Sequence, residues 1–237
     1  MVAFMSMPAA PSADGGHFGL MDKVYQRQRY IYDFTRKYYL VGRDSLIDDL
    51  GLKPAETLIE IGCGTGRNLI AIARRYPDSR LYGLDASAQM LRTARDQLAR
   101  AGLADRVTLV HGLAENLIPG DFGQDSFDHA LFSYSLSMIP DWRQAIFSAV
   151  KALSAKGHIH IVDFGDLKTL PGKAVLQHWL ALFHVTPRAE LLEALEALFA
   201  EPDEALTLFT GRYAFRLSTA KGSMGLLLCG ATDTGRA

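Results

Sequence analysis

The chain contains little cysteine and almost no net charge. Two of its 237 residues are cysteine, Cys63 and Cys229, and 25 basic residues stand against 26 acidic ones, which gives a net charge of −1. Two cysteines are too few for a disulfide framework, which favours a reducing compartment and predicts a cytoplasmic protein. With so little net charge the chain has no overall basic field, and we expect no nucleic-acid partner.

Hydrophobic runs of membrane-spanning length are also missing. The longest apolar runs, such as residues 179–183, are far shorter than the roughly 20 residues of a transmembrane helix. Residues 1–17 are rich in Ala, Pro, Ser and Gly, with neither the basic start nor the apolar centre of a signal peptide. We predict a flexible tail there and no transmembrane segment.

The chain does have a regular alternation of strand and helix patterns. Strands are predicted at 57–61, 80–85, 107–111, 129–133 and 158–162, and helices at 68–75, 88–101 and 141–153. Such alternation is typical of a parallel sheet with helices on both faces. With 49% hydrophobic residues the chain can bury the core of one α/β domain, which we place at 52–237 behind an N-terminal helical lid at 18–51.

The first predicted strand runs into a turn with glycine at every second position. Gly62, Gly64 and Gly66 permit positive φ and let a ligand approach the main chain. Their spacing is G-x-G-x-G, not the G-x-G-x-x-G that packs a dinucleotide pyrophosphate, which disfavours an NAD-type cofactor. Glu60 is acidic in an otherwise apolar strand, and a carboxylate there suits a cationic ligand better than a phosphate.

A second acid, Asp85, ends the second predicted strand 19 residues after Gly66, where doubly wound folds bind ribose hydroxyls. The block from Glu60 to Asn68 together with Asp85 resembles the first two motifs of class I S-adenosylmethionine-dependent methyltransferases. The resemblance implies a Rossmann-like, seven-stranded sheet. It also implies that the glycine turn holds the amino-acid end of S-adenosylmethionine and Asp85 its ribose, with S-adenosylhomocysteine as product and no metal.

Further cofactor contacts are expected from the lid and from the loops after the second, third and fourth strands. These candidates are Arg43, Ala86, Met90, Gly112, Leu113, Ala114 and Ser133. Met90 either covers the adenine or belongs to the core. Arg43 could hold the cofactor carboxylate. After the fifth strand we predict helices at 173–183 and 189–199 in an insertion at about 166–210, and strands at 213–218 and 225–229. In the family this terminal hairpin completes the sheet.

Basic and aromatic residues are concentrated in the lid. Residues 21–43 hold six bases and two acids, a local charge of +4 in a chain whose total is −1. Such a segment could lie on an anionic membrane surface with its tyrosines at the headgroups. It could instead be a helix that closes the cofactor pocket, and one helix could do both.

Several longer strings are more specific than the cofactor motifs. Residues 29–36, 42–44, 133–143, 162–166 and 183–188 are similar to bacterial diacylglyceryl-homoserine N-methyltransferases of betaine-lipid synthesis. The resemblance implies three methyl transfers to the amine of a lipid headgroup by an enzyme peripherally attached to the inner face of the cell membrane, with anionic phospholipids as partners. Alternatives are methylation of phosphatidylethanolamine and a non-catalytic lipid- or cofactor-binding protein. The sequence does not indicate an oligomeric state.

Methyl transfer to an amine needs alignment, removal of a proton, and stabilisation of growing positive charge on nitrogen. Tyr25, Tyr32 and Tyr134 are the predicted catalytic residues. A homoserine carboxylate also needs a cationic partner. The residues predicted to bind the acceptor are Arg143, His184, Arg188 and Arg212.

Overall fold

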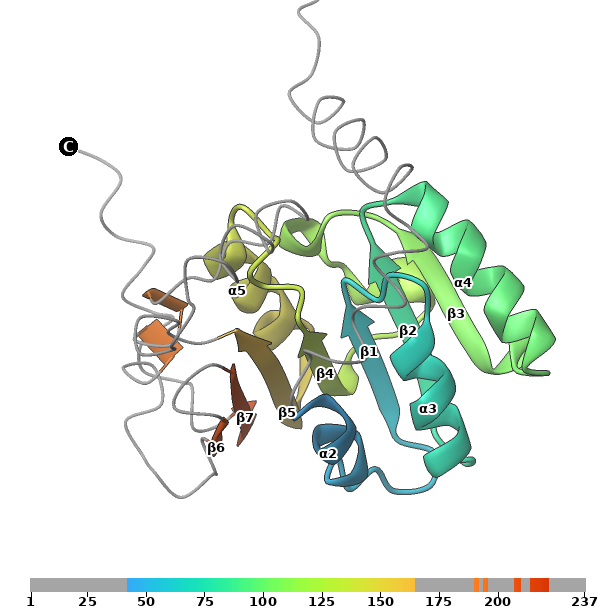
Figure 1. Ribbon diagram of the computed structural model, residues 1–237, viewed down its shortest axis with the longest axis horizontal. Coiled ribbons are helices and arrows are strands. Elements are labelled where there is room, and N and C mark those ends of the chain that lie inside the picture. The colour runs from blue at the N-terminus through green and yellow to red at the C-terminus, as the bar shows by residue number, and fades with distance from the viewer. Residues whose placement is uncertain (1–41, 165–189, 192–193, 196–206, 210–213, 222–237) are drawn as a thin grey trace, which may run out of the picture.

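A seven-stranded sheet in the order β3-β2-β1-β4-β5-β7-β6 organises the computed structural model (Figure 1), which describes residues 42–164, 190–191, 194–195, 207–209 and 214–221. The strands are β1 (Thr57–Ile61), β2 (Arg80–Asp85), β3 (Val107–His111), β4 (Phe127–Ser133), β5 (Leu153–Phe164), β6 (Thr207–Phe209) and β7 (Ala214–Ala220). Strands β1 to β5 pair in parallel, and β7 runs antiparallel to both β5 and β6. The predicted Rossmann-like fold with seven strands is confirmed.

Helices cover both faces of this sheet (Figure 1). They are α2 (Arg43–Asp48), α3 (Arg67–Arg75), α4 (Ala88–Arg100) and α5 (Trp142–Ala152), with short 3-10 turns η1 (Ala104–Arg106), η2 (Ala114–Asn116) and η3 (Pro119–Phe122). Side chains fix two of the helix starts: Ser87 Oγ accepts from Met90 N at 3.2 Å, and Asp141 Oδ1 accepts from Gln144 N at 3.1 Å. No helix in the described ranges is long and apolar enough to cross a membrane.

The core consists of two apolar clusters, one on each face of the sheet. On one face, Leu58 packs in a cluster with Leu46 of α2 and Leu69 of α3; on the other, Ile59 packs in a cluster with Ile146 of α5. Successive side chains of a strand point to opposite faces of the sheet, and both faces are covered here, so all five residues of β1 are buried. The apolar residues of β1 therefore contribute to both halves of the core.

The strand predictions agree closely with the structure in the first half of the sheet. Strands β1, β2 and β3 have the predicted bounds, whereas β4 and β5 begin earlier than predicted, at 127 and 153. The expected partner of β7 has to be corrected. The prediction paired it with a later strand at 225–229, whereas in the structure β7 pairs with β6, which precedes it in the chain. Residues 225–229 themselves lie outside the described residues. A three-residue strand such as β6 carries too short an alternation to be read from sequence.

The predicted lid and insertion are only partly described. Of the lid, the structure describes α2 and its flanking residues, and of the insertion it describes residues 190, 191, 194, 195 and 207–209. The first four are helical, as predicted for 189–199, and Leu191 and Leu195 are fully buried. The tail at 1–17 and the predicted helix at 173–183 lie outside the described residues.

Candidate cofactor and acceptor site

The glycine turn at the carboxyl end of β1 leaves no room for side chains. Gly62, Gly64 and Gly66 have φ values of 77°, 54° and 76°, which glycine adopts readily. A Cβ on Gly62 would lie 2.6 Å from Ser135 Cβ, and one on Gly66 would lie 3.2 Å from Ala94 Cβ. The turn is therefore tied to glycine by both its backbone conformation and its close neighbours.

Two buried carboxylates flank this turn. Asp85 Oδ2 accepts a hydrogen bond from Gly64 N at 2.7 Å, and its Oδ1 accepts from Ser87 N at 2.8 Å. Glu60 is 1% exposed, and its Oε1 accepts from Asn68 Nδ2 at 2.6 Å. Asp85 thus stabilises the shape of the turn and also lies where the ribose was expected. A ribose bound there would share the carboxylate oxygens of Asp85 with the N–H groups of Gly64 and Ser87.

The thiol of Cys63, within the turn, reports the local electrostatics. Burial raises the pKa of Cys63 well above its usual value, and the negative charges of Asp85 and Glu60 raise it further. A neutral thiol at this position is not a nucleophile. The same two charges that disfavour a thiolate favour a cationic ligand at the turn.

The loops after β2 and β3 meet beside the turn. His111 Nε2 lies 3.0 Å from the Ala86 carbonyl oxygen, and Gly112 N donates to the Asp85 carbonyl oxygen at 3.1 Å. Met90 and Ala114 are buried, at 2% and 8% exposure. The predicted adenine-side residues Ala86, Met90, Gly112, Leu113 and Ala114 thus come from two adjoining loops and their flanking helical turns, and both interpretations of Met90 remain open.

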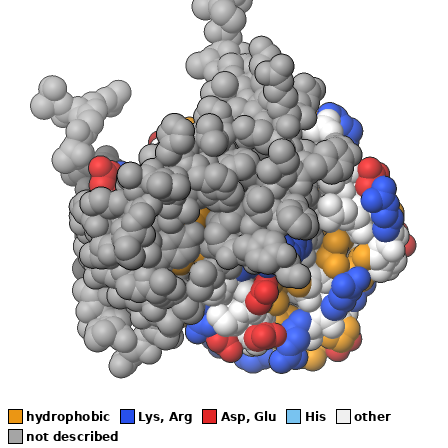
Figure 2. All heavy atoms as spheres, in the orientation of Figure 1, with side chains coloured by type: hydrophobic (Ala, Val, Ile, Leu, Met, Phe, Trp, Pro, Cys, Tyr) orange, Lys and Arg blue, Asp and Glu red, His pale blue; other side chains and the backbone are white. Residues whose placement is uncertain are grey.

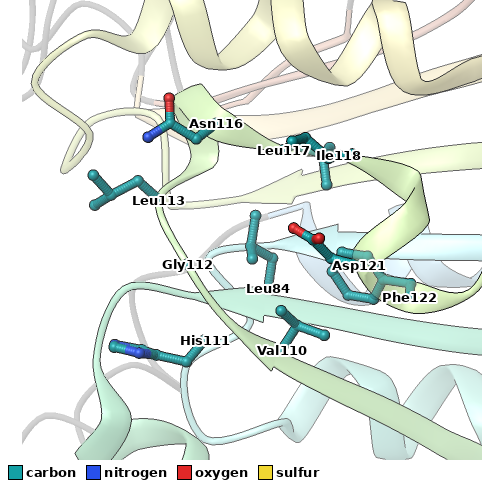
Figure 3. Close-up of a pocket in the computed structure, with 10 residues that line it drawn as sticks. All are labelled: Leu84, Val110, His111, Gly112, Leu113, Asn116, Leu117, Ile118, Asp121 and Phe122. Atoms are coloured by element: carbon teal, nitrogen blue, oxygen red, sulfur yellow. The ribbon is translucent and has the colours of Figure 1, made fainter.

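A cavity of about 180 Å³ opens next to these loops (Figure 3). Leu84 and Val110 of the strands and Phe122 of η3 contribute apolar side chains, and Asp121 adds a carboxylate. Gly112 and Leu113, both predicted to contact the cofactor, line the same cavity. An apolar crevice with a few polar groups is the usual form of a small-ligand subsite.

The loop after β4 packs against the glycine turn from the other side. Ser135 Oγ donates to the Ile61 carbonyl oxygen at 2.8 Å, and Tyr134 N donates to the Val162 carbonyl oxygen at 2.7 Å. Tyr134 has φ 55°, rare for a residue with a side chain, and its ring packs edge-on against Phe164 at 4.7 Å between centroids. The structure places Tyr134 at the predicted strand end with its ring inside an apolar cluster.

Two hydroxyls of this region are buried and unusual. Ser133 and Ser137 are 3% and 2% exposed. Ser133 Oγ has no hydrogen-bond partner among the described residues, and Ser137 Oγ has none of good geometry, although it lies close enough to Asp163 to lower the pKa of that carboxyl group. Such groups are uncommon in folded proteins and call for an explanation. Ser133 was predicted to contact the cofactor, whereas Ser137 was not singled out.

Asp163, at the end of β5, is a site residue that the predicted set omitted. It has no exposed surface; Oδ2 accepts from Ser137 N at 3.1 Å and Oδ1 accepts from Phe164 N at 2.8 Å. Burial raises the pKa of Asp163 to about 6, although these N–H groups oppose the shift. The signal that predicted Asp85, an acid at the end of a strand, is also present for Asp163 and could have identified it.

The remaining candidates either have local partners of their own or lie outside the described residues. Arg43 is buried, and its Nε and Nη2 both donate to Asp44 Oδ1, at 3.0 and 2.9 Å. Arg143 is exposed, and its guanidinium lies over the Trp142 ring at 4.2 Å. Tyr25, Tyr32, His184, Arg188 and Arg212 lie outside the described residues. Within the described ranges no group of three His, Cys, Asp or Glu is placed to hold a metal ion.

Comparison with known proteins points to one fold class. Residues 58–157 match the family model described as a methyltransferase domain. Demethylmenaquinone methyltransferases of several Staphylococcus aureus strains are 28% identical over 155 residues, which is 65% of this chain and 61% of theirs. The chain therefore spans less than two thirds of the length of these curated relatives.

Solved structures agree with the family match at the level of the fold. The methyltransferase SibL in its apo form is 20% identical with a TM-score of 0.60, over 86% of this chain and 61% of that one. An S-adenosylmethionine-dependent methyltransferase from Aquifex aeolicus is 13% identical with a TM-score of 0.58, over 88% and 99%. The [4+2]-cyclase SpnF, 20% identical, has a TM-score of 0.54 over 70% and 65%.

The fold is that of the class I methyltransferases, and the domain match supports an S-adenosylmethionine-dependent methyltransferase. Because a structure named as a cyclase shares this fold, the fold alone does not define the reaction. The chemistry has to be argued from the residues around the glycine turn.

Proposed function

We propose that this chain binds S-adenosylmethionine at the glycine turn and transfers its methyl group to an acceptor at the β4 edge. The observation that carries the proposal is a turn closed to side chains and flanked by two buried carboxylates, Glu60 and Asp85. S-adenosylmethionine combines a sulfonium, an ammonium group and a ribose diol. Carboxylates suit the two cations and accept hydrogen bonds from the diol, whereas a pyrophosphate would be repelled.

The protein's part in such a reaction is positioning. When bound, the cofactor supplies an electrophilic methyl group, which is displaced in line by the acceptor. Asp85 and the turn would hold the ribose and the amino-acid end. The loop from Ser133 to Ser137 would form the wall beside the methyl group and exclude water, since its hydrogen bonds to β1 and β5 are already in place.

The acceptor we propose is the amine of a lipid headgroup, diacylglyceryl homoserine, methylated three times to the betaine lipid. Support comes from the similarity of residues 133–143 and 162–166. Of these, the structure describes 133–143, which include the loop after β4, and 162–164, which end β5. Attachment to anionic membrane surfaces would use the basic segment 21–43, of which the structure describes only residues 42 and 43. On the described surface seen in Figure 2, side chains of both charges are interspersed.

Demethylmenaquinone is a second candidate acceptor. The observation that favours it is the name of the curated relatives, which are 28% identical to this chain over 155 residues. Both candidates are lipids that would be presented at a membrane surface, but they differ in the atom that receives the methyl group. One assay can therefore separate them.

Two measurements test the proposal in sequence. Calorimetric titration with S-adenosylmethionine and with S-adenosylhomocysteine should show saturable binding of both, and absence of binding would overturn the proposal. The protein is then incubated with S-adenosylmethionine and vesicles that contain diacylglyceryl homoserine, phosphatidylethanolamine or demethylmenaquinone. Mass spectrometry of the extracted lipids identifies the acceptor and counts its methyl groups. Binding without a methylated product in any vesicle would favour the non-catalytic alternative.

A further inference from the structure

Asp163 is a buried carboxylate in apolar surroundings. On β5 it shares its sheet face with Ile159 and Ile161, and Phe215 lies opposite it on β7. All three neighbours are fully buried. A carboxylate in such a place loses its hydration, and among the described residues no cation forms an ion pair with it. Its partners are backbone N–H groups.

Two of these N–H groups, those of Leu136 and Ser137, belong to the acceptor loop, which we define as residues 134–138. Ser137 N donates to Asp163 Oδ2 at 3.1 Å, and the N–H of Leu136 also favours the charged form of Asp163. The loop contains the positive φ of Tyr134, and the turn of Met138 N to the Ser135 carbonyl oxygen at 3.0 Å. A strained backbone persists only where its surroundings hold it, and the Asp163 carboxylate is one such hold.

A buried hydroxyl lies just before the acceptor loop. Ser133 Oγ is more than nine-tenths buried without a hydrogen-bond partner among the described residues. The same loop touches the glycine turn, where a Cβ on Gly62 would collide with Ser135. A shift of the loop would therefore change both the acceptor side of the site and its distance from the turn.

We propose that Asp163 is a positioning residue for methyl transfer: its carboxylate holds the acceptor loop against the glycine turn, and its protonation releases the loop. This inference rests on the proposed function for its role in catalysis, while the link between Asp163 and the loop is a property of the fold. The role is one of positioning, because Asp163 acts on the loop through Ser137.

The titration of Asp163 makes the link measurable. Burial places the pKa of Asp163 at about 6, and the N–H groups of Leu136, Ser137 and Phe164 and the Ser137 hydroxyl face its carboxylate and oppose the shift. The charged side chains on the helical segments covering this face are exposed; in the described residues they are Asp141, Arg143, Lys151 and Glu190. Protonation turns one carboxylate oxygen from an acceptor into a donor, so the hydrogen bond to the loop weakens as the pH falls through 6.

Trp142 provides a signal that does not depend on activity. It is buried at the start of α5, four residues after the acceptor loop ends. The chain has one other tryptophan, Trp179. In the full chain with Trp179→Phe, we expect Trp142 fluorescence to change with a midpoint near pH 6 and Asp163→Asn to abolish the transition. Asp141→Asn is the matched control. It alters a carboxylate next to Trp142 that also accepts a backbone N–H, and the transition should remain.

The kinetic arm uses the acceptor identified by lipid mass spectrometry. Asp163→Asn should lower kcat at least tenfold and remove the loss of rate below pH 6, while the KM for S-adenosylmethionine stays within twofold. Lower thermal stability with unchanged kcat would mean a purely structural role and overturn the inference. A fluorescence transition that survives in Asp163→Asn would also overturn it.

Failure of the two proposals can be told apart. If S-adenosylmethionine does not bind the unmodified chain, the proposed function fails and the catalytic role of Asp163 fails with it, although the fluorescence transition still stands. If the cofactor binds but no transition occurs near pH 6, only the present inference fails. Should Asp163→Asn not fold, carboxyl-carbon NMR of the unmodified chain decides: a carboxyl group titrating near pH 6 supports the inference, and none titrating there overturns it.

Discussion

At the carboxyl ends of β1, β2 and β5, buried carboxylates accept hydrogen bonds mostly from backbone N–H groups. Nearer the amino ends of the same sheet, a carboxylate and two buried imidazoles bond one another instead. His129 Nε2 lies 3.1 Å from Glu56 Oε2, His129 Nδ1 lies 2.9 Å from His160 Nε2, and His160 Nδ1 lies 3.0 Å from Ser218 Oγ. We call these four residues the histidine chain.

The direction of the hydrogen bonds in the histidine chain follows from its acid. An ionised Glu56 only accepts, so His129 Nε2 carries a proton and its Nδ1 accepts from His160 Nε2. His160 Nδ1 then accepts from the Ser218 hydroxyl. Both imidazoles are neutral in this arrangement, and every nitrogen has a partner. Burial lowers the pKa of His129, and lowers that of His160 to about 3, which agrees with neutral rings.

The comparison shows that the larger hollow is not the better candidate site. The histidine chain lines a cavity of about 700 Å³, against about 180 Å³ beside the glycine turn. Its rings, with that of His158, stack within 12–21° of parallel, so their nitrogen lone pairs do not converge on one point. Every ring nitrogen of His129 and His160 already has a hydrogen-bond partner within the histidine chain. At the carboxyl edge, by contrast, the buried Ser133 hydroxyl has no hydrogen-bond partner among the described residues.

We expect the largest effect from a substitution in the glycine turn, at the carboxyl edge of the sheet. Gly62→Ala should cost about 3 kcal/mol of stability or abolish cofactor binding, since its Cβ would lie 2.6 Å from Ser135 Cβ. Gly102→Ala is the control: Gly102 has a similar φ of 70° but nothing within 4 Å of the added Cβ, so it should cost about 1–2 kcal/mol. Urea unfolding and calorimetry measure both. Equal losses would mean that the close approach to Ser135 is unimportant.

The two regions should respond to acid with opposite signs. The folded-state pKa of His160, about 3, is below the usual 6.5, so its contribution to stability is lost as the pH falls below 6.5. The folded-state pKa of Asp163, about 6, is above the usual 3.8, so between pH 6 and 3.8 acidification stabilises the folded chain through this group. Within that window the two effects oppose each other.

Removing either group should reveal the other. In Asp163→Asn, the free energy of unfolding should fall between pH 6 and 4 more steeply than in the unmodified chain, by about 1.4 kcal/mol per pH unit. In His160→Gln, whose amide can still donate to His129, the loss on acidification should become smaller. Urea titrations at several pH values give these slopes. Parallel curves for all three proteins would show that neither group titrates as the structure indicates.

The cofactor prediction contrasts two acids of similar bonding. Asp85→Ala should weaken S-adenosylmethionine binding by about 1.5–3 kcal/mol, because it removes charge-assisted contacts and loosens the turn at Gly64. Asp128, beside the amino end of β1, also accepts a backbone N–H, from Thr57 at 3.0 Å. Asp128→Asn should therefore leave cofactor affinity unchanged. Calorimetry on both folded variants makes the comparison, and unchanged affinity in Asp85→Ala would show that the ribose assignment is mistaken.

The smallest expected effect is at the end of the histidine chain. Ser218→Ala removes the hydrogen bond to His160 and should cost about 1 kcal/mol of stability without changing cofactor affinity. Ser154→Ala, which removes a longer contact of 3.4 Å to Asp128, should cost less. Denaturant unfolding separates the two. A loss of cofactor binding in Ser218→Ala would mean that the two regions of the sheet are coupled.

Much of the fold could be predicted because its signals are local. Strand β1 is mostly apolar and leads into a glycine-rich turn, and β2 ends in an acid, so their bounds and the place of the turn could be predicted from the sequence. The early start of β5 was not, because Ser154 and Lys156 lack the apolar character that marks a strand. The short β6 was missed since its pairing with β7, and not its own pattern, makes it a strand.

The sequence by itself determined the alternation of elements, the glycine turn and the two acids beside it, because periodicity and backbone freedom are properties of neighbouring residues. Only the tertiary structure joined Asp163 to Ser137, 26 positions apart, and Glu56 to His129 and His160 across three strands. These contacts depend on strand order and register, which no single segment encodes. Burial then decided the chemistry, since the same carboxyl or imidazole titrates differently once water is excluded.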